Sequence, residues 1–176
     1  PVVSVNGKEA GKWAYGYNAF RIDITPFIQF GKSNLIEVHL NNVEESSRWY
    51  PGGGLYRPVS VELYGNENFS TWDTFVRTLK ADKQEAEVEV NALLEGKTGK
   101  SGKTVIALLD EAGKKVAEQT VTGANPEIKT TLKVANPQLW SPESPYLYQV
   151  KLTRYEGKKV ADVQTLKTGI RTIAVS

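Results

Sequence analysis

Hydrophobic and polar residues alternate along much of this chain, in short runs that predict β-strands. The clearest runs near the start are Val2–Val5 and Leu35–Leu40. In the second run the apolar side chains fall on one face, while Glu37 and His39 fall on the other. A period of two residues is typical of a strand with one buried face. Asn6-Gly7 follows the first run directly, and this dipeptide is the strongest short signal for a β-hairpin.

The rest of the first 65 residues combines extended segments with one short turn of helix. Trp13–Ile24 is rich in aromatic residues and predicts an extended segment. Thr25–Ile28 predicts one helical turn, with Thr25 as the N-cap and Pro26 at the first helical position. The apolar side chains of Val59–Leu63 alternate and predict a further strand.

Small polar residues at Gly65–Asn68 predict a domain boundary, after which the strand signals become more regular. Turn residues separate these strands about every 8–12 positions, which is typical of an antiparallel sandwich. About seven or eight strands in roughly 110 residues fit one immunoglobulin-like domain, which we expect to span residues 66–176. The expected strands are Trp72–Lys80, Ala86–Leu94, Thr104–Asp110, Lys115–Thr122, Glu127–Val134, Tyr146–Tyr155, Val160–Lys167 and Gly169–Val175.

A second distinctive segment, Pro137–Tyr148, contains several prolines and aromatic residues. Pro142 and Pro145 cannot donate backbone hydrogen bonds, so regular structure is not expected there. We expect the segment to cross one end of the sandwich in an extended form. Trp140 would then act as a plug over the core.

The composition is that of a protein with ordinary hydrophobic cores and no strong electric field. The chain has 176 residues, 40% of them hydrophobic, and a formal net charge of +2. The basic residues are scattered along the chain rather than clustered, so we expect neither nucleic acid nor a membrane as a partner. No apolar run approaches the roughly 20 residues of a membrane helix. The chain lacks methionine and opens inside the first predicted strand, and we therefore expect an excised piece of a larger protein.

The chemistry-bearing residues do not predict a self-contained active site. His39 is the single histidine and cysteine is absent, so neither a nucleophilic triad nor a zinc site is expected. No loop carries alternating oxygen ligands for calcium, and we expect no metal and no cofactor. Glycoside hydrolysis needs two carboxylic acids that flank the scissile bond. The acids here fall mainly in turns, such as Asp110 and Glu111, or on strand faces where water should keep their pKa values ordinary.

The least ordinary stretch is Ser46–Pro58, in which three consecutive glycines begin at Gly52. Consecutive glycines permit unusual backbone angles and close approach to another surface. The residues Arg48, Trp49 and Tyr50 precede them and could supply an aromatic face and a planar hydrogen-bonding group to a sugar. The alternative is that these aromatic side chains simply pack the loop onto its own sheet.

Four blocks of the first 65 residues carry a family resemblance. They are Val-Asn-Gly-Lys at 5–8, Gly-Tyr-Asn-Ala-Phe-Arg-Ile-Asp-Ile-Thr at 16–25, Asn-Leu-Ile-Glu-Val at 34–38 and Ser-Arg-Trp-Tyr-Pro-Gly-Gly-Gly-Leu-Tyr-Arg-Pro-Val at 47–59. In order and spacing they resemble the sugar-binding domain of family 2 glycoside hydrolases, which include β-galactosidases, β-glucuronidases and β-mannosidases. Leu-Trp-Ser-Pro-Glu-Ser-Pro-Tyr-Leu-Tyr at 139–148 and Gly-Ile-Arg-Thr-Ile at 169–173 resemble the end of that family's immunoglobulin-like second domain.

The resemblance implies an all-β chain in which a partial jelly-roll β-sandwich precedes an immunoglobulin-like β-sandwich. Residues 1–65 would be the C-terminal part of the sugar-binding jelly-roll domain, and residues 66–176 the second domain. In this family a third domain, a (β/α)8 barrel, carries both catalytic glutamates, and its motifs have no counterpart here. No catalytic residue is therefore assigned. The family's equivalent of the glycine loop leans toward the barrel, which implies substrate binding by Arg48, with Trp49 and Tyr50 as further candidates.

The main hypothesis is a non-catalytic fragment of a family 2 glycoside hydrolase, with a β-galactosidase that acts on terminal β-galactosides as the first choice. The implied partners are that carbohydrate and the catalytic barrel of the same chain, and a homo-oligomeric parent is compatible with the sequence. The family suggests a periplasmic or secreted bacterial parent. The alternative is a stand-alone carbohydrate-binding or structural β-sandwich module, and the sugar and its linkage stay open.

Two smaller expectations follow. Half a jelly roll leaves an open sheet edge and an apolar face, so residues 1–65 should be partly disordered, paired between chains or docked on the second domain. Asn68-Phe69-Ser70 has the pattern of a glycosylation acceptor, although this triplet is common by chance.

Overall fold

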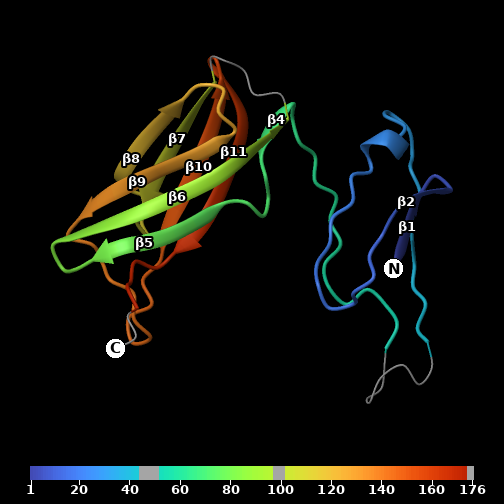
Figure 1. Cartoon of the computed structure of the whole chain (residues 1–176), viewed down its shortest axis with the longest axis horizontal. Coiled ribbons are helices and arrows are strands. Elements are labelled where there is room, and N and C mark those ends of the chain that lie inside the picture. The colour runs from blue at the N-terminus through green and yellow to red at the C-terminus, as the bar shows by residue number, and fades with distance from the viewer. Residues whose placement is uncertain (44–51, 97–101, 174–176) are drawn as a thin grey trace. The chain divides into compact units, whose positions relative to one another are not determined.

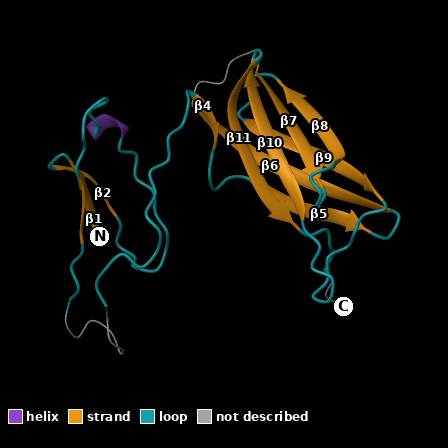
Figure 2. Ribbon diagram, turned by 180° about the vertical axis from the view of Figure 1, so that it is seen from behind, coloured by secondary structure: helices purple, strands orange, loops and turns teal. Residues whose placement is uncertain are grey.

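The computed structural model of the chain describes residues 1–43, 52–96 and 102–173. These residues form an all-β protein, as expected, with antiparallel pairing throughout (Figures 1 and 2). The chain divides into two compact units, Pro1–Val61 and Glu62–Ser176. Among the described residues, no helix is long and apolar enough to cross a membrane.

The first unit is built on a three-stranded sheet in the order β2-β1-β3. Its strands are β1 (Val2–Val5), β2 (Lys8–Lys12) and β3 (Ile36–His39). The hairpin expected after the first strand is confirmed, because Asn6 and Gly7 connect β1 to β2 with φ angles of 52° and 76°. Positive φ at both central residues is the requirement of a type I′ turn, which Asn-Gly meets best.

The expected helical turn is present as the 3-10 helix η1 (Thr25–Phe27), but its predicted cap is wrong. Thr25 is the first residue of the helix instead of the residue before it. The backbone N–H of Thr25 donates to Asp23 Oδ1 at 2.9 Å. A carboxylate two residues upstream therefore satisfies one of the free N–H donors at the start of this helix.

The strand expected at Val59–Leu63 is absent, and that prediction is wrong. The segment has no ladder partner among the described residues, and Leu63 is 90% exposed. Trp13–Ile24 likewise contains no strand. Alternation predicts a strand only where a neighbouring strand can accept its backbone hydrogen bonds, and here the described part of the chain offers none.

The core of the first unit is small. Val3 and Val5 are its buried hydrophobic residues among those described. Many of its large apolar side chains are exposed instead, namely Trp13, Tyr15, Tyr17, Phe30, Leu35, Ile36, Val43, Leu55, Tyr56, Val59 and Val61. The sheet of this unit thus covers little apolar surface by its own packing.

The second unit is a sandwich of two antiparallel sheets (Figures 1 and 2). One sheet has the order β11-β10-β7-β8; in the other, β6 pairs with β4 and β5 along one edge and with β9 along the other. The strands are β4 (Glu67–Phe69), β5 (Phe75–Ala81), β6 (Glu85–Gly96), β7 (Gly102–Leu109), β8 (Lys115–Thr122), β9 (Glu127–Ala135), β10 (Tyr148–Glu156) and β11 (Lys159–Thr168).

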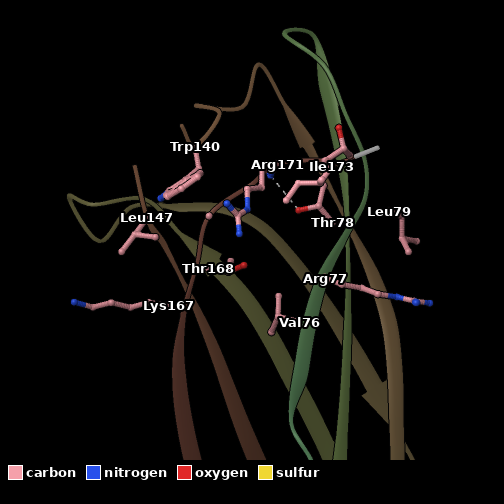
Figure 3. A pocket seen from close by; sticks show the side chains of 12 residues that line it. Val76, Arg77, Thr78, Leu79, Trp140, Leu147, Lys167, Thr168, Arg171 and Ile173 are labelled. Carbon is pink, nitrogen blue, oxygen red and sulfur yellow. Dashed lines mark hydrogen bonds between the residues drawn. The ribbon is translucent and has the colours of Figure 1, made fainter. Parts of the chain in front are cut away.

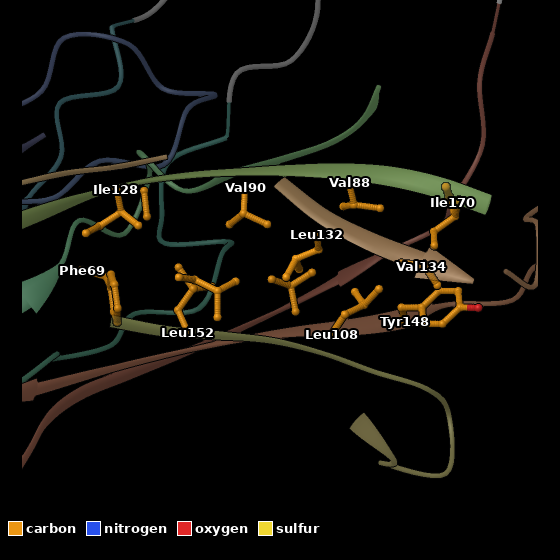
Figure 4. Packing of buried hydrophobic residues seen from close by; sticks show 14 of the residues in the cluster. Phe69, Val88, Val90, Leu108, Ile128, Leu132, Val134, Tyr148, Leu152 and Ile170 are labelled. Carbon is orange, nitrogen blue, oxygen red and sulfur yellow. The ribbon is translucent and has the colours of Figure 1, made fainter. Parts of the chain in front are cut away.

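The core of the second unit lies between these two sheets, where alternate side chains of facing strands meet (Figure 4). The central strand β6 contributes every second residue from Ala86 to Leu94. Leu132 from β9 faces Leu108 of β7 and Leu152 of β10 in the same cluster. The period of two residues that predicted these strands is therefore the period with which they fill the core.

The strand assignments of the second half are confirmed for β5 to β11, apart from shifts of a few residues at their ends. The strand expected at Gly169–Val175 is wrong, because the described residues of this segment, 169–173, are not in a strand. Ile170 is fully buried there, and its carbonyl accepts the backbone N–H of Trp140 at 2.9 Å. In β4, Glu67 and Asn68 are buried strand residues.

Candidate functional site

The residues expected to touch a sugar, Arg48, Trp49 and Tyr50, lie outside the described residues, which end at 43 and resume at 52. The glycines that follow them are described. Gly54 has a φ of 143°, a conformation that residues with a Cβ rarely adopt. A Cβ at Gly53 would lie 3.6 Å from the Cβ of Asn42, an ordinary contact. Of the three glycines, Gly54 is therefore the one whose backbone angle requires glycine.

The residues after the glycines are hydrogen-bonded to the segment that contains Gly16. The hydroxyl of Tyr56 donates to the carbonyl of Gly16 at 3.3 Å, a contact that spans 40 positions of sequence. The guanidinium of Arg57 lies 5.5 Å from the centre of the Tyr56 ring, within the range of a cation–π contact. Both contacts fix the orientation of the Tyr56 side chain.

A group of exposed aromatic rings belongs to the same unit. Trp13 and Phe20 stack with 5.9 Å between ring centres, and Tyr15 and Tyr17 lie 5.7 Å apart in a tilted pair. Tyr17 is 64% exposed. Open aromatic faces can stack on the apolar face of a sugar ring, and they can equally pack against another polypeptide surface. The described residues of the first unit therefore offer an aromatic contact surface.

The described carboxyl groups with a resolved pKa shift are not candidates for a general acid. Asp23, Asp82 and Glu89 are the described carboxyls with a resolved pKa shift, and each pKa is lowered. The causes are hydrogen bonds to the charged form, from Thr25 to Asp23, from backbone N–H groups to Asp82 and first from the Asn91 amide to Glu89. A glycosidase acid needs a raised pKa to hold its proton near neutral pH. These three groups are ionised there instead.

Metal and nucleophile chemistry also find no assembled site among the described residues. No group of three or more His, Cys, Asp or Glu side chains lies close enough together to hold a metal ion there. His39 is exposed at the end of β3, as its place on the polar face predicted.

One open groove is present in the second unit, with a volume of about 700 Å³ (Figure 3). It lies between β5, the end of β11 and the segments that contain Trp140 and Arg171. The prediction that Trp140 is a plug over the core is wrong. Trp140 is only half-buried, and the Arg171 guanidinium lies 4.2 Å from the centre of its ring. Tyr148, Ile170 and the partly buried Leu139 pack against or within the core at this end.

A buried ion pair was missed by the sequence reasoning. Arg154 Nη2 lies 2.8 Å from Glu67 Oε1, and both side chains are almost completely buried. Arg154 stands at the inward position of β10 that follows Tyr148, Val150 and Leu152 in the alternation. A charged residue in phase with core positions is the signal that could have found it, because such a charge needs a buried partner.

The glycosylation triplet at Asn68 is not available in the folded protein. Asn68 is 7% exposed and its amide donates to the carbonyl of Phe69 at 3.1 Å. Ser70 is buried as well, and its hydroxyl bonds to Asp73. A glycan attached here would have no room while β4 is paired with β6.

Comparison with known proteins gives consistent matches over the whole chain. The sequence profile of glycosyl hydrolases family 2 matches residues 69–171. A putative beta-glucuronidase of Formosa agariphila is 38% identical over 173 residues, and a beta-galactosidase of Bacteroides ovatus, BoGH2A, is 33% identical over 181 residues; each match covers 98% of this chain. The solved structure of a glycosyl hydrolase family 2 member from Bacteroides cellulosilyticus superposes with a TM-score of 0.91 at 38% identity over 98% of this chain.

The matched proteins are much longer than this chain. It spans 16% of the Formosa agariphila protein, 21% of BoGH2A and 23% of the Bacteroides cellulosilyticus structure. The likeness therefore concerns a minority of each protein's length, and most of each lies outside the comparison.

Proposed function

The chain belongs to glycosyl hydrolase family 2, and on that premise we propose that it is the non-catalytic, sugar-site-supporting part of a larger glycoside hydrolase. The family resemblance carried by its sequence blocks is thereby confirmed. The observation that carries the proposal is the coverage: 98% of this chain aligns with 21% of a family member such as BoGH2A. Such a protein has ample length for a separate catalytic domain.

The proposed role has two parts. The immunoglobulin-like unit supports a catalytic (β/α)8 barrel, and the loop at 46–58 lends one wall to the sugar site through Arg48, Trp49 and Tyr50. The aromatic contacts that hold Tyr56 support this role, because they fix the described side of the loop. Positioning matters here, since a misplacement of about 1 Å near the chemistry can lower a rate about a hundredfold.

We propose terminal β-galactosides as the substrate of the larger enzyme. A relative at 33% identity, BoGH2A, is named a beta-galactosidase. The second candidate is a β-glucuronide, because the Formosa agariphila relative at 38% identity is named a putative beta-glucuronidase. Arg48 would suit this substrate chemically, since a guanidinium binds a uronate carboxylate in a bidentate manner.

The experiment compares two proteins on two substrates. The 176-residue chain and the longer gene product that contains it are assayed with nitrophenyl β-galactoside and nitrophenyl β-glucuronide. We expect no hydrolysis by the chain alone, and hydrolysis of the galactoside by the longer protein. Hydrolysis by the chain alone would refute the non-catalytic role, and preference for the glucuronide would select the second candidate.

A further inference from the structure

The groove in the second unit has a single charged group directed along its wall. In Figure 3 the guanidinium of Arg171 lies between Trp140 and Thr168, while the side chains of Arg77 and Lys167 extend away from it on opposite sides. Arg77 is already paired, because its Nε lies 2.8 Å from Glu89 Oε1. The charge that a ligand in this groove would meet is therefore that of Arg171.

The Arg171 side chain is held in place before any ligand arrives. Its guanidinium stacks on Trp140 with 4.2 Å to the ring centre. The indole also lies close to Gly169, where an added Cβ would lie 2.7 Å from the ring. The backbone N–H of Arg171 donates to the hydroxyl of Thr78 on β5 at 3.4 Å. A stacked guanidinium loses little entropy when its N–H edge binds a carboxylate.

The Arg171 guanidinium has no acidic partner in the described part of the chain. No aspartate or glutamate lines the groove, and no ion pair joins Arg171 to a described carboxylate. Exposed apolar side chains also line this groove, with Leu147 36% and Ile173 76% exposed. An arginine and a tryptophan beside exposed apolar side chains have the composition of an interface hot spot.

A sugar fits this groove less well than a polypeptide does. Saccharide sites present an open aromatic face beside planar hydrogen-bonding side chains. Here the Arg171 guanidinium lies over the Trp140 ring, so the aromatic face and the planar group cover each other, and no described Asn, Gln, Asp or Glu lines the groove. The positive charge of Arg171 favours a ligand with a carboxylate. The exposed apolar side chains of the groove favour a ligand whose carboxylate is flanked by aliphatic side chains.

We propose that this groove is the docking site for a segment of the catalytic domain that presents a carboxylate to Arg171 between apolar side chains. The proposal rests on the proposed function for the identity of the partner. The contact between Arg171 and a carboxylate does not depend on which glycoside the larger enzyme cleaves. Arg171 would thus be a positioning residue that holds the barrel against the immunoglobulin-like unit.

The first test uses the isolated chain and defined probes. The peptides acetyl-Leu-Asp-Leu-amide and acetyl-Leu-Asn-Leu-amide are titrated while NMR follows the indole N–H of Trp140 and the Nε–H of Arg171. We expect the Asp peptide to shift both signals and to bind about tenfold more tightly than the Asn peptide, because a hydrogen bond to a charged group is lost. Arg171→Ala should abolish that difference, whereas Lys151→Ala, a charge removed from an exposed position of β10, should preserve it.

The second test asks whether the groove is covered in the longer gene product. Hydrogen exchange of residues 76–79 and 167–173 should be at least about tenfold slower there than in the isolated chain, and Arg171→Ala should reduce this protection. Equal exchange in the two proteins, or equal binding of the two peptides, would overturn the proposal. A groove that responds to glucuronate and not to the Asp peptide would also overturn it, in favour of a saccharide site. If the proposed glycosidase function is wrong, the substrate assays show it and the peptide titration is unaffected. If the docking proposal is wrong, the peptide titration and the hydrogen exchange show it, so the two cases can be told apart.

Discussion

Arg154 on β10 and Glu67 on β4 form a buried ion pair across 87 positions of sequence, with 2.8 Å between Nη2 and Oε1. The guanidinium also donates to the carbonyl of Gly123 at 3.2 Å and to the hydroxyl of Thr104 at 3.3 Å. Glu67 belongs to the first strand of the second unit. The pair therefore connects the start of the second unit to β10, a central strand of the opposite sheet.

Removal of one partner of this pair should be strongly destabilising. We expect Glu67→Ala or Arg154→Ala to lower the free energy of unfolding by about 3–5 kcal/mol, because each leaves an uncompensated buried charge. Urea denaturation of the whole chain, followed by tryptophan fluorescence, measures the effect. The double variant Glu67→Leu/Arg154→Met should lose less than either single variant, because it leaves no buried charge. Single-variant losses within about 0.5 kcal/mol of zero, the range of neutral surface changes, would contradict this account.

Gly102 provides the space that the Arg154 guanidinium occupies. A Cβ at this position would overlap Arg154 Nη2, whose other contacts leave it little freedom to move. We expect Gly102→Ala to cost about 1–3 kcal/mol by overpacking, and to cost less when Arg154 is already replaced by methionine. Gly16→Ala is the matched control, because nothing lies within 4 Å of a Cβ there. Equal costs in the two backgrounds would show that Gly102 acts through its backbone instead.

Glu89 should make the stability of the sandwich sensitive to acid. Its carboxylate accepts hydrogen bonds from Asn91 at 3.0 Å and from Arg77 at 2.8 Å, and Lys129 lies 3.3 Å away. The Asn91 amide is the largest cause of its lowered pKa. A lowered folded-state pKa stabilises the fold above the ordinary value of 4.5, and this stabilisation is lost as pH falls through the folded-state pKa.

The measurement is the urea midpoint as a function of pH, in the original chain and in Glu89→Gln. Below pH 4.5 the original chain should lose stability more steeply than the variant, whose amide does not titrate in this range. Glu143→Gln, at an exposed position of the segment between β9 and β10, is the matched control and should keep the original slope. Parallel curves for all three proteins would rule out the contribution of Glu89.

Arg48 should affect the kinetics of the larger enzyme without affecting the fold of this chain. If it contacts the sugar as proposed, Arg48→Ala removes a charge-assisted hydrogen bond and should reduce kcat/KM about ten- to a hundredfold. The kcat/KM of Arg57→Ala is a suitable comparison, because this variant removes an arginine from the same loop region, where Arg57 contacts Tyr56. An unchanged kcat/KM for Arg48→Ala would remove this residue from the proposed sugar site.

The strands of the second unit were predictable because burial there follows local alternation. In β6 and β9, residues such as Val88 and Leu132 are both in phase with their strand and in the core. Each of these strands has paired neighbours, so local pattern and tertiary environment agree. The likeness to part of a larger enzyme came from the family resemblance, because the alternation of apolar and polar residues carries no information about it.

The failures come from positions where a distant partner decides the outcome. Val59–Leu63 alternates like a strand but has no ladder partner among the described residues. Trp140 looked like a core plug because indoles bury well, yet Gly169 and Arg171 hold its ring at the end of the sandwich. Glu67 reads as part of a polar boundary until its partner, 87 positions later, is known. The candidate sugar residues Arg48, Trp49 and Tyr50 stay predictions.

The first unit should exchange its amide hydrogens faster than the second, because their cores differ in size. Among the described residues, β1 supplies Val3 and Val5 as the buried apolar side chains of its unit, whereas β6, β7 and β10 all line the larger core. We expect the hydrogen-bonded amides of β1 to exchange about a hundredfold faster or more than those of β6. Protection of β1 that rises with protein concentration would mean that a second copy covers its apolar surface. Uniformly strong protection in a demonstrated monomer would contradict the expectation, because the buried apolar side chains described in the first unit, Val3 and Val5, are too few to account for it.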